Sequence, residues 1–153
     1  MELGSTRPAL NVSPSPLFVS EGWQLFSLSV SPPGAGANFS LQLDDRFIFR
    51  VKVVRFRLTT SAAVANRLVT LRVTPPSFNP FGFPAGGVQA ASLALFYTCA
   101  WFGGPIANDA FGGYVQLPYF EVEEGTVISS AVSLIDVADA IDQIFVTGLR
   151  RRL

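Results

Sequence analysis

Residues 47–59 (FIFRVKVVRFRLT) alternate between apolar and mostly charged side chains, with the period of a β-strand that buries one face. The apolar positions are odd-numbered up to Val53 and even-numbered from Val54 to Leu58. A one-residue change of phase inside a long strand predicts a β-bulge at Val53–Val54, because a bulge returns the apolar side chains to the core side. The alternative is two strands with a corner between them.

The rest of the chain beyond residue 22 has the same organisation of apolar runs and turns. Segments rich in Gly, Pro, Asn or Asp separate the runs, at 31–38, 75–87, 102–113 and 123–125. The runs predict about eight strands, at 23–30, 39–43, 47–59, 67–74, 90–102, 114–120, 126–134 and 143–150. Only residues 136–142 (DVADAID) suggest a loop or a short helical turn. We therefore expect residues 23–153 to form an all-β domain, an antiparallel β-sandwich of the jelly-roll type, with an immunoglobulin-like sandwich as the alternative.

The run at 90–102 is apolar on both faces of the predicted strand. Tyr97 and Cys99 fall on one face, whereas Phe96 and Ala100 fall on the other. A strand that is apolar on both faces must be covered on both. We expect the core of the domain to cover one face and a neighbouring subunit to cover the other.

The chain carries few ions for a soluble domain. Charged residues make up 14% of its 153 residues, whereas globular domains average about 25%. Such a surface is poorly suited to a monomer in water, so we expect other protein to cover much of it. The longest apolar stretch, residues 93–102, is too short for a membrane-spanning helix, and the N-terminus lacks the pattern of a secretory signal. These features predict an intracellularly made subunit of an assembly, with no membrane partner.

The residue types present argue against catalysis and cofactor binding. The chain has no His and one Cys, Cys99, which excludes His-dependent triads, His- or Cys-based zinc sites and an intrachain disulfide. The carboxylates at 121, 123 and 124 resemble a hairpin end more than a glycosidase pair, and those at 136, 139 and 142 lack EF-hand spacing. Eleven basic residues balance eleven acidic ones, so no nucleic-acid partner is expected. We expect no enzyme, no metal and no cofactor.

Basic and acidic residues are separated along the chain. The charged residues of 46–72 are all basic, and those of 109–142 are all acidic. Two interpretations stay open: the two segments pair within one sandwich, or a basic face of one subunit meets an acidic face of the next. The candidate interface charges are Arg50, Lys52, Arg55, Arg57, Glu121 and Glu123.

Residues 1–22 differ from the rest, because their prolines oppose helix and no regular period emerges. The segment is either a disordered terminus or an extended arm that orders on a neighbouring subunit. Our hypothesis is the arm, whose candidate contacts are Leu10, Val12, Leu17, Phe18 and Val19.

The loop at 75–87 places three phenylalanines between prolines. These rings either fold back over the end of the sandwich or dock in a pocket of a partner. The candidate interface aromatics are Phe78, Phe81, Phe83 and Trp101.

Three segments share a recognisable order of features: VKVVRFRLTTSAAVANRLVTLRV (51–73), VQLPYFEVEEGTVIS (115–129) and DAIDQIFVTGLR (139–150). A strand enters a TTSA-x-VANR turn, a later strand ends in Leu-Pro before a glycine turn, and an Asp-rich loop precedes the last strand. In this order they resemble a family of small structural proteins of tailed bacteriophages. The resemblance covers residues 47–150, and its most specific positions are Thr59, Thr60, Ser61, Val64, Ala65, Asn66 and Arg67.

Within that family, the chain most resembles the capsid decoration (auxiliary or cement) protein of a thermophilic siphophage. The resemblance implies a homotrimer on the outer surface of the capsid, made in the host cytoplasm, whose partner is the major capsid protein. It also implies a structural TTSAAVANR turn, in which Asn66 takes a left-handed backbone position or caps the turn and Arg67 locks it.

The expected function is therefore that of a structural virion protein, which stabilises the capsid by clamping neighbouring major capsid subunits. The alternative is a carbohydrate- or receptor-binding module of a phage tail. Such a module needs exposed aromatic platforms, and the candidates are Trp101, Tyr114 and Tyr119.

Overall fold

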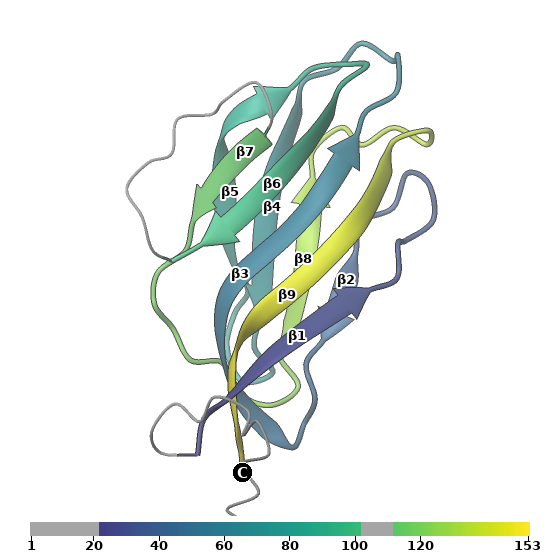
Figure 1. Cartoon of the computed structure of the whole chain (residues 1–153). Helices are drawn as coiled ribbons and strands as arrows, with labels where there is room; N and C mark the ends of the chain where they lie inside the picture. Colours follow the sequence, from purple (N-terminus) through teal and green to yellow (C-terminus); the bar gives the residue numbers. More distant parts are fainter. Residues whose placement is uncertain (1–21, 102–111) are drawn as a thin grey trace, which may run out of the picture.

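The computed structural model describes residues 22–101 and 112–153, which form nine strands and no helix. The strands build two sheets that pack face to face (Figure 1). The five-stranded sheet has the order β1 (Gln24–Val30), β9 (Ala140–Arg152), β3 (Phe47–Thr59), β6 (Ala94–Ala100) and β7 (Gly112–Gln116). The four-stranded sheet has the order β2 (Ser40–Gln42), β8 (Val127–Val132), β4 (Arg67–Thr74) and β5 (Phe81–Gln89).

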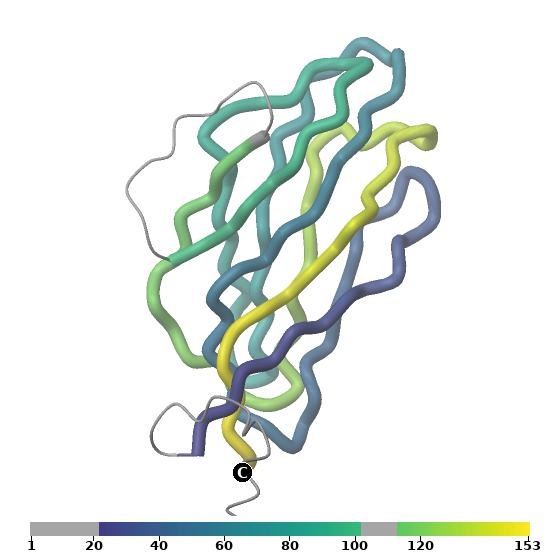
Figure 2. Tube along the Cα trace, in the orientation of Figure 1, coloured from purple at the N-terminus to yellow at the C-terminus, as the bar shows by residue number. Residues whose placement is uncertain are grey.

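The strand pairing is that of a jelly roll. β1 pairs with β9, β2 with β8, β3 with β6 and β4 with β5, all antiparallel, so the second half of the chain runs back along the first. Successive pairs lie in opposite sheets, as the chain path in Figure 2 shows, and this wraps the ribbon into a sandwich. The predicted all-β jelly-roll sandwich is confirmed, and the immunoglobulin-like alternative is not observed. One strand departs from the prediction, because β7 pairs parallel with β6 at the sheet edge.

The phase change predicted within residues 47–59 is a bulge in a single strand, and no corner interrupts β3. In the pairing with β9, Val51 lies opposite Gly148 and Val53 lies opposite Thr147, which leaves Lys52 as the extra residue. The predicted position, Val53–Val54, is therefore wrong by one residue. A second irregularity separates Arg55 from Arg57. The bulge explains the buried set, which is Phe49, Val51, Val54, Phe56 and Leu58.

The prediction that residues 75–87 form only a turn is wrong, because β5 occupies most of this segment. β5 is the edge strand next to β4, a position where Pro84 needs no ladder partner on its outer side. Its register with β4 shifts between Leu68, which faces Val88, and Thr70, which faces Pro84. This irregularity places Gly86 and Gly87 inside a strand, where the sequence suggested a turn.

The other strands agree with the predicted runs within a few residues at each end, and β3 and β4 have the predicted bounds. The segment at 136–142 is a loop and turn up to Asp139, after which β9 begins. Of the run at 90–102, only residues 94–100 form a strand. Most of the predicted turn at 102–113 lies outside the described residues.

The core lies between the two sheets and is built from aromatic and branched side chains of both. The ring of Phe56 stacks on Tyr97 at 5.6 Å and meets the edge of Phe39 at 5.1 Å. Burial raises the pKa of the Cys99 thiol to about 12, so this thiol stays protonated and unreactive in the folded protein. The outward face of β6 is partly covered by Arg55, whose guanidinium lies 4.4 Å from the Phe96 ring centre. Coverage of this face by another subunit stays a prediction.

Candidate functional site

Four loops meet at one end of the sandwich, which is the top of Figure 1 and lies away from the C-terminus. They comprise residues 31–38, 60–66, 90–93 and 133–139, and we call them the loop end. The jelly-roll path brings them together, because β1, β3, β5 and β8 all end there. Backbone hydrogen bonds join them: Gly36 N donates to Asp139 O at 2.7 Å, and Ser92 N donates to Ser61 O at 2.8 Å.

A buried ion pair holds the loop end from inside. The guanidinium of Arg67, which is fully buried, donates from Nε and Nη2 to the two carboxylate oxygens of Asp139 at 3.0 and 3.1 Å. Its Nη1 donates to the carbonyl oxygens of Ala63 and Ala65 at 2.8 and 2.9 Å. Arg67 therefore fixes the turn at 60–66 against the loop at 133–139. Asn66 does not take the left-handed backbone position, the first of the two roles that the resemblance implied. Its role as a cap of the turn stays a prediction.

Asp139 is the centre of this network, and its surroundings favour the charged form. Burial alone would raise the pKa of its carboxyl, but the N–H groups of Asp136 (2.8 Å) and Ser61 (2.7 Å) and the Arg67 guanidinium outweigh it. The pKa of Asp139 therefore lies below its ordinary value of 3.8. The pair stays ionised at neutral pH.

We expect this lowered pKa to make the fold acid-sensitive below about pH 4. A carboxyl whose pKa is lower in the folded state contributes its full stabilisation above its unfolded pKa and loses it as the pH falls through its folded pKa. Urea midpoints measured between neutral and acid pH should fall for the wild type and fall less for Asp139→Asn, which cannot ionise. Parallel pH dependences of the two proteins would contradict the role given to this carboxylate.

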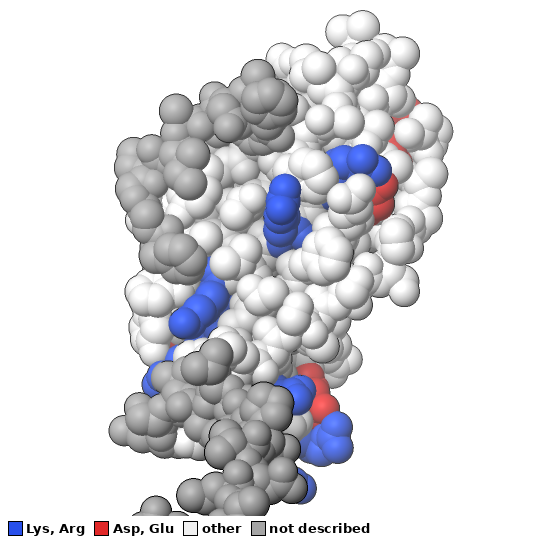
Figure 3. Space-filling model, in the orientation of Figure 1, with Lys and Arg blue, Asp and Glu red and all other residues white. Residues whose placement is uncertain are grey.

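The outer surface of the loop end is apolar. Val64, Val137 and Leu134 are 98%, 83% and 71% exposed, and Leu93 is also exposed. The charged residues of these four loops are Asp136 and Asp139, and both accept hydrogen bonds from neighbouring backbone N–H groups. In Figure 3 the top of the molecule is accordingly white apart from a small acidic area. Apolar patches without ions mark interaction sites on soluble domains.

Two backbone features show that the loop end is strained and closely packed. Leu134 has a φ of 52°, a left-handed conformation that costs an L-residue other than Gly roughly 1–2 kcal/mol. Gly36 has a φ of 72°, and a Cβ there would lie 2.8 Å from the Cα of Val137, so the loops at 31–38 and 133–139 pack closely. An exposed Leu in a position that suits Gly or Asn is typical of a residue kept for contact rather than for folding.

Three of the candidate interface charges form ion pairs inside the chain, and the other three form none with a described residue. Arg50 Nε donates to Glu121 at 2.7 Å, and the Arg57 fork donates to Asp142 at 2.8 and 2.6 Å. Together with the Arg67 pair, these contacts join the basic and acidic segments within one chain, as the internal-pairing interpretation expects. Lys52, Arg55 and Glu123 form no ion pair with any other described residue.

The candidate aromatics gather at the opposite end of the sandwich. Phe81 and Phe83 pack against each other at a ring distance of 5.8 Å and against Phe120 at 6.3 and 6.1 Å, so both fold back on the domain. Phe78 is 72% exposed. Trp101 meets the ring of Tyr119 edge-on at 5.2 Å.

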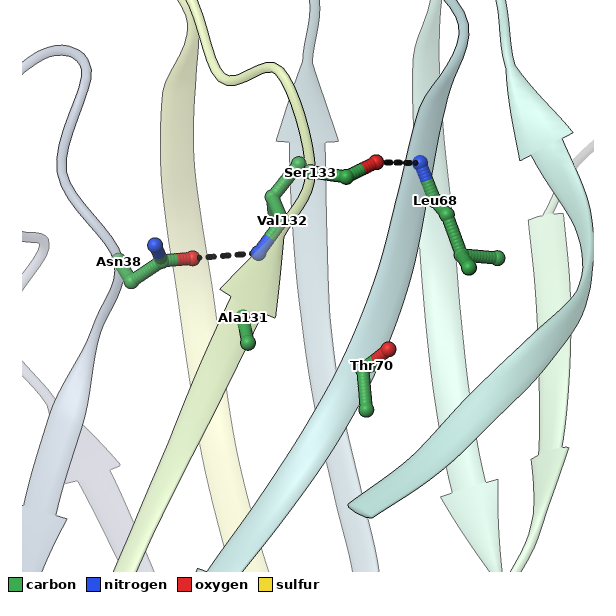
Figure 4. Close-up of a pocket in the computed structure, with 6 residues that line it drawn as sticks. All are labelled: Asn38, Leu68, Thr70, Ala131, Val132 and Ser133. Atoms are coloured by element: carbon green, nitrogen blue, oxygen red, sulfur yellow. Dashed lines mark hydrogen bonds between the residues drawn. The ribbon is translucent and has the colours of Figure 1, made fainter.

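A shallow groove of about 260 Å³ lies over β4 and β8 (Figure 4). Its polar groups serve the backbone: Asn38 Oδ1 accepts from Val132 N at 3.0 Å, and Ser133 Oγ accepts from Leu68 N at 2.8 Å. Leu68, Thr70 and Ala131 complete its walls, so the groove presents methyl groups and no titratable side chain.

The proposed arm contacts Leu10, Val12, Leu17, Phe18 and Val19 lie outside the described residues. Within 22–101 and 112–153, no helix is long and apolar enough to cross a membrane, and no three His, Cys, Asp or Glu side chains are grouped as metal ligands.

No protein-family model matches the chain, and no curated protein and no solved structure is significantly similar to it.

Sequence reasoning found Arg67 but did not single out Leu134, Val137 or the role of Asp139. The available signal was the presence of bulky aliphatic side chains between the predicted strand runs or at their ends.

Proposed function

We propose that this chain is a structural virion protein, a capsid decoration or cement protein without enzyme activity. It forms homotrimers on the outer capsid surface and clamps neighbouring major capsid subunits. The observation that carries the proposal is the loop end, where a buried ion pair joins two of four hydrogen-bonded loops, which expose aliphatic side chains and no free basic group. The low charged fraction of the chain and its jelly-roll fold also support it.

The physical mechanism is burial of apolar surface at several weak contacts. Each square ångström of apolar area removed from water contributes about 25 cal/mol before the costs of association. A rigid surface loses little conformational freedom on binding, so more of this free energy is retained. Three copies held in one trimer would bind through a high effective concentration, which multiplies weak single contacts.

The proposal is tested by the assembly state of the chain and by its binding to capsids. Size-exclusion chromatography with light scattering should give a trimer, and the protein should co-sediment with empty capsids of the parent virus and raise their melting temperature. A protein that stays monomeric at micromolar concentration and leaves the capsids unbound contradicts the proposal.

We expect Leu134→Asp to weaken capsid binding by at least about tenfold, which corresponds to 1.4 kcal/mol, because it places a charge in the apolar patch. Asp tolerates the left-handed backbone better than Leu, so the fold should not lose stability. Leu25→Asp on β1, which is also exposed but lies outside the loop end, is the matched control. Equal binding by Leu134→Asp and the wild type would remove the loop end from the contact.

The alternative is a carbohydrate- or receptor-binding module of a phage tail. The observation that favours it is the Trp101–Tyr119 pair, since Tyr119 is half exposed and its ring could support a sugar. Glycan-array binding that is abolished by Trp101→Ala would support this alternative against capsid decoration.

A further inference from the structure

A small cleft lies at the end of the sandwich opposite the loop end. It has a volume of about 310 Å³ and is lined by Pro75, Phe78, Phe81, Glu121, Val122 and Glu123. The topology assembles it, because β4 ends just before Pro75, β5 begins at Phe81, and Val122 forms a bridge with Phe49 near the start of β3. Its lining is thus four apolar residues and two carboxylates, with no basic side chain.

The two carboxylates of the cleft differ in what they already bind. Glu121 accepts from Arg50 Nε at 2.7 Å, and that guanidinium is itself held 3.9 Å from the Trp23 ring centre. Glu123 has no ion pair among the described residues. Its oxygens accept from Ser77 N at 2.9 Å and Ser77 Oγ at 3.1 Å. Glu123 is therefore an uncompensated negative charge that two hydrogen bonds hold in place.

The aromatic residues of the cleft are more exposed than their size predicts. Phe78 is 72% exposed, and Phe81 is 39% exposed although it packs on Phe83. Phenyl faces attract cations, and the attraction strengthens when the cation leaves bulk water. An exposed Phe beside an unpaired carboxylate thus offers two kinds of contact to the same positive group.

We propose that this cleft binds a basic side chain, arginine or lysine, of a partner polypeptide. The long aliphatic stem of such a side chain lies along Pro75, Val122 and Phe81, and the charged head meets Glu123 beside the Phe78 ring. Arginine fits best, because its planar guanidinium can stack on a ring and donate to a carboxylate at once. The volume is at the lower limit of about 300–1,000 Å³ for ligand sites, which suits one side chain.

The cleft is at the other end of the domain from the loop end, so its occupant is independent of the proposed function. Binding at the cleft can fail while capsid binding persists, and the reverse also holds. The two outcomes are therefore distinguishable in the same set of variants.

The test is a titration of the full chain, labelled with ¹⁵N, with the peptide acetyl-Ala-Arg-Ala-amide, followed by amide chemical shifts. We expect saturable shifts confined to residues 75–81 and 121–123, with a Kd of about 1–10 mM as fits one side chain. The citrulline peptide, which is isosteric and neutral, should bind at least about tenfold more weakly. Raising the ionic strength should also weaken binding of the arginine peptide.

Matched variants separate the cleft from general surface charge. Glu123→Gln and Phe78→Ser should each weaken the arginine peptide about fivefold or more. Phe78 is exposed, so Phe78→Ser tests the site without disturbing the fold. Glu124→Gln removes the neighbouring carboxylate, which does not line the cleft, and should leave the Kd unchanged. Three outcomes would overturn the proposal. The citrulline peptide could bind as tightly as the arginine peptide, guanidinium ion alone could cause the same shifts as the arginine peptide, or no saturable shift could occur at residues 75–81 and 121–123.

Discussion

Replacing Arg67 by alanine is expected to lower the free energy of unfolding by about 3–5 kcal/mol. The change leaves the Asp139 carboxylate fully buried without its counter-ion, because both side chains are 0% exposed. It also removes the donor that the carbonyl oxygens of Ala63 and Ala65 share. Equilibrium unfolding in guanidinium chloride, followed by tryptophan fluorescence, measures the change as a shift of the midpoint.

The matched control is Arg72→Ala, which removes an exposed arginine from the same strand, β4. Its effect should be small, because exposed charges far from buried networks contribute little to stability. The double variant Arg67→Ala/Asp139→Ala should lose less stability than the sum of the two single variants. Each single variant leaves one buried charge without a partner, whereas the double variant leaves none. Additive effects of the two changes, or equal effects of Arg67→Ala and Arg72→Ala, would contradict the buried pair.

The stabilising role of Arg67 bears on function, because the loop end depends on it for rigidity. A protein that loses the ion pair should keep Val64 and Leu134 on its surface but no longer hold them in one arrangement. Partner binding should then fall even under conditions where Arg67→Ala is still folded. Contact residues held in place by buried side chains are what the proposed clamp requires.

The sequence predicts the strands that are read from local alternation. β3 and β4 have the predicted bounds, because each alternates along its own length and its period is visible without knowledge of its neighbours. β5 was missed for the opposite reason. Its Gly and Pro content is typical of a turn, and only its pairing with β4, from Arg67 with Gln89 to Val73 with Phe81, makes it a strand.

The candidate site is less predictable than the fold, because its parts come from distant segments. Arg67 and Asp139 are 72 residues apart in the chain, and nothing in either local sequence shows that they meet. Leu134 closes the predicted strand run at 126–134, whereas Val64 and Val137 lie between predicted strands. Their convergence on one surface follows only from the order of strands in the jelly roll, which places these loops at the same end.

Replacing Gly148 by alanine is expected to destabilise the fold by about 3 kcal/mol or more, at the upper end of overpacking costs. Gly148 lies in the middle of β9, opposite Val51, where β3 carries its bulge. A Cβ at this position would collide with the carbonyl oxygen of Arg50 and lie 3.0 Å from the backbone N of Lys52. Both obstacles are backbone atoms of a paired strand, so neither can move aside as a side chain would.

The control for Gly148→Ala is Gly86→Ala in β5, where a Cβ would meet no atom within 4 Å. That change should be neutral or stabilise the protein by about 0.4–1 kcal/mol, because alanine reduces the freedom of the unfolded chain. Thermal and guanidinium unfolding midpoints of both variants measure the difference in stability. If Gly148→Ala is insoluble, the yields of soluble protein from the two variants give the same comparison. Equal midpoints would show that the bulge can shift along β3. If they differ as expected, the change of phase in residues 47–59 requires a residue without a side chain on the neighbouring strand, because the bulge brings the two backbones into contact there.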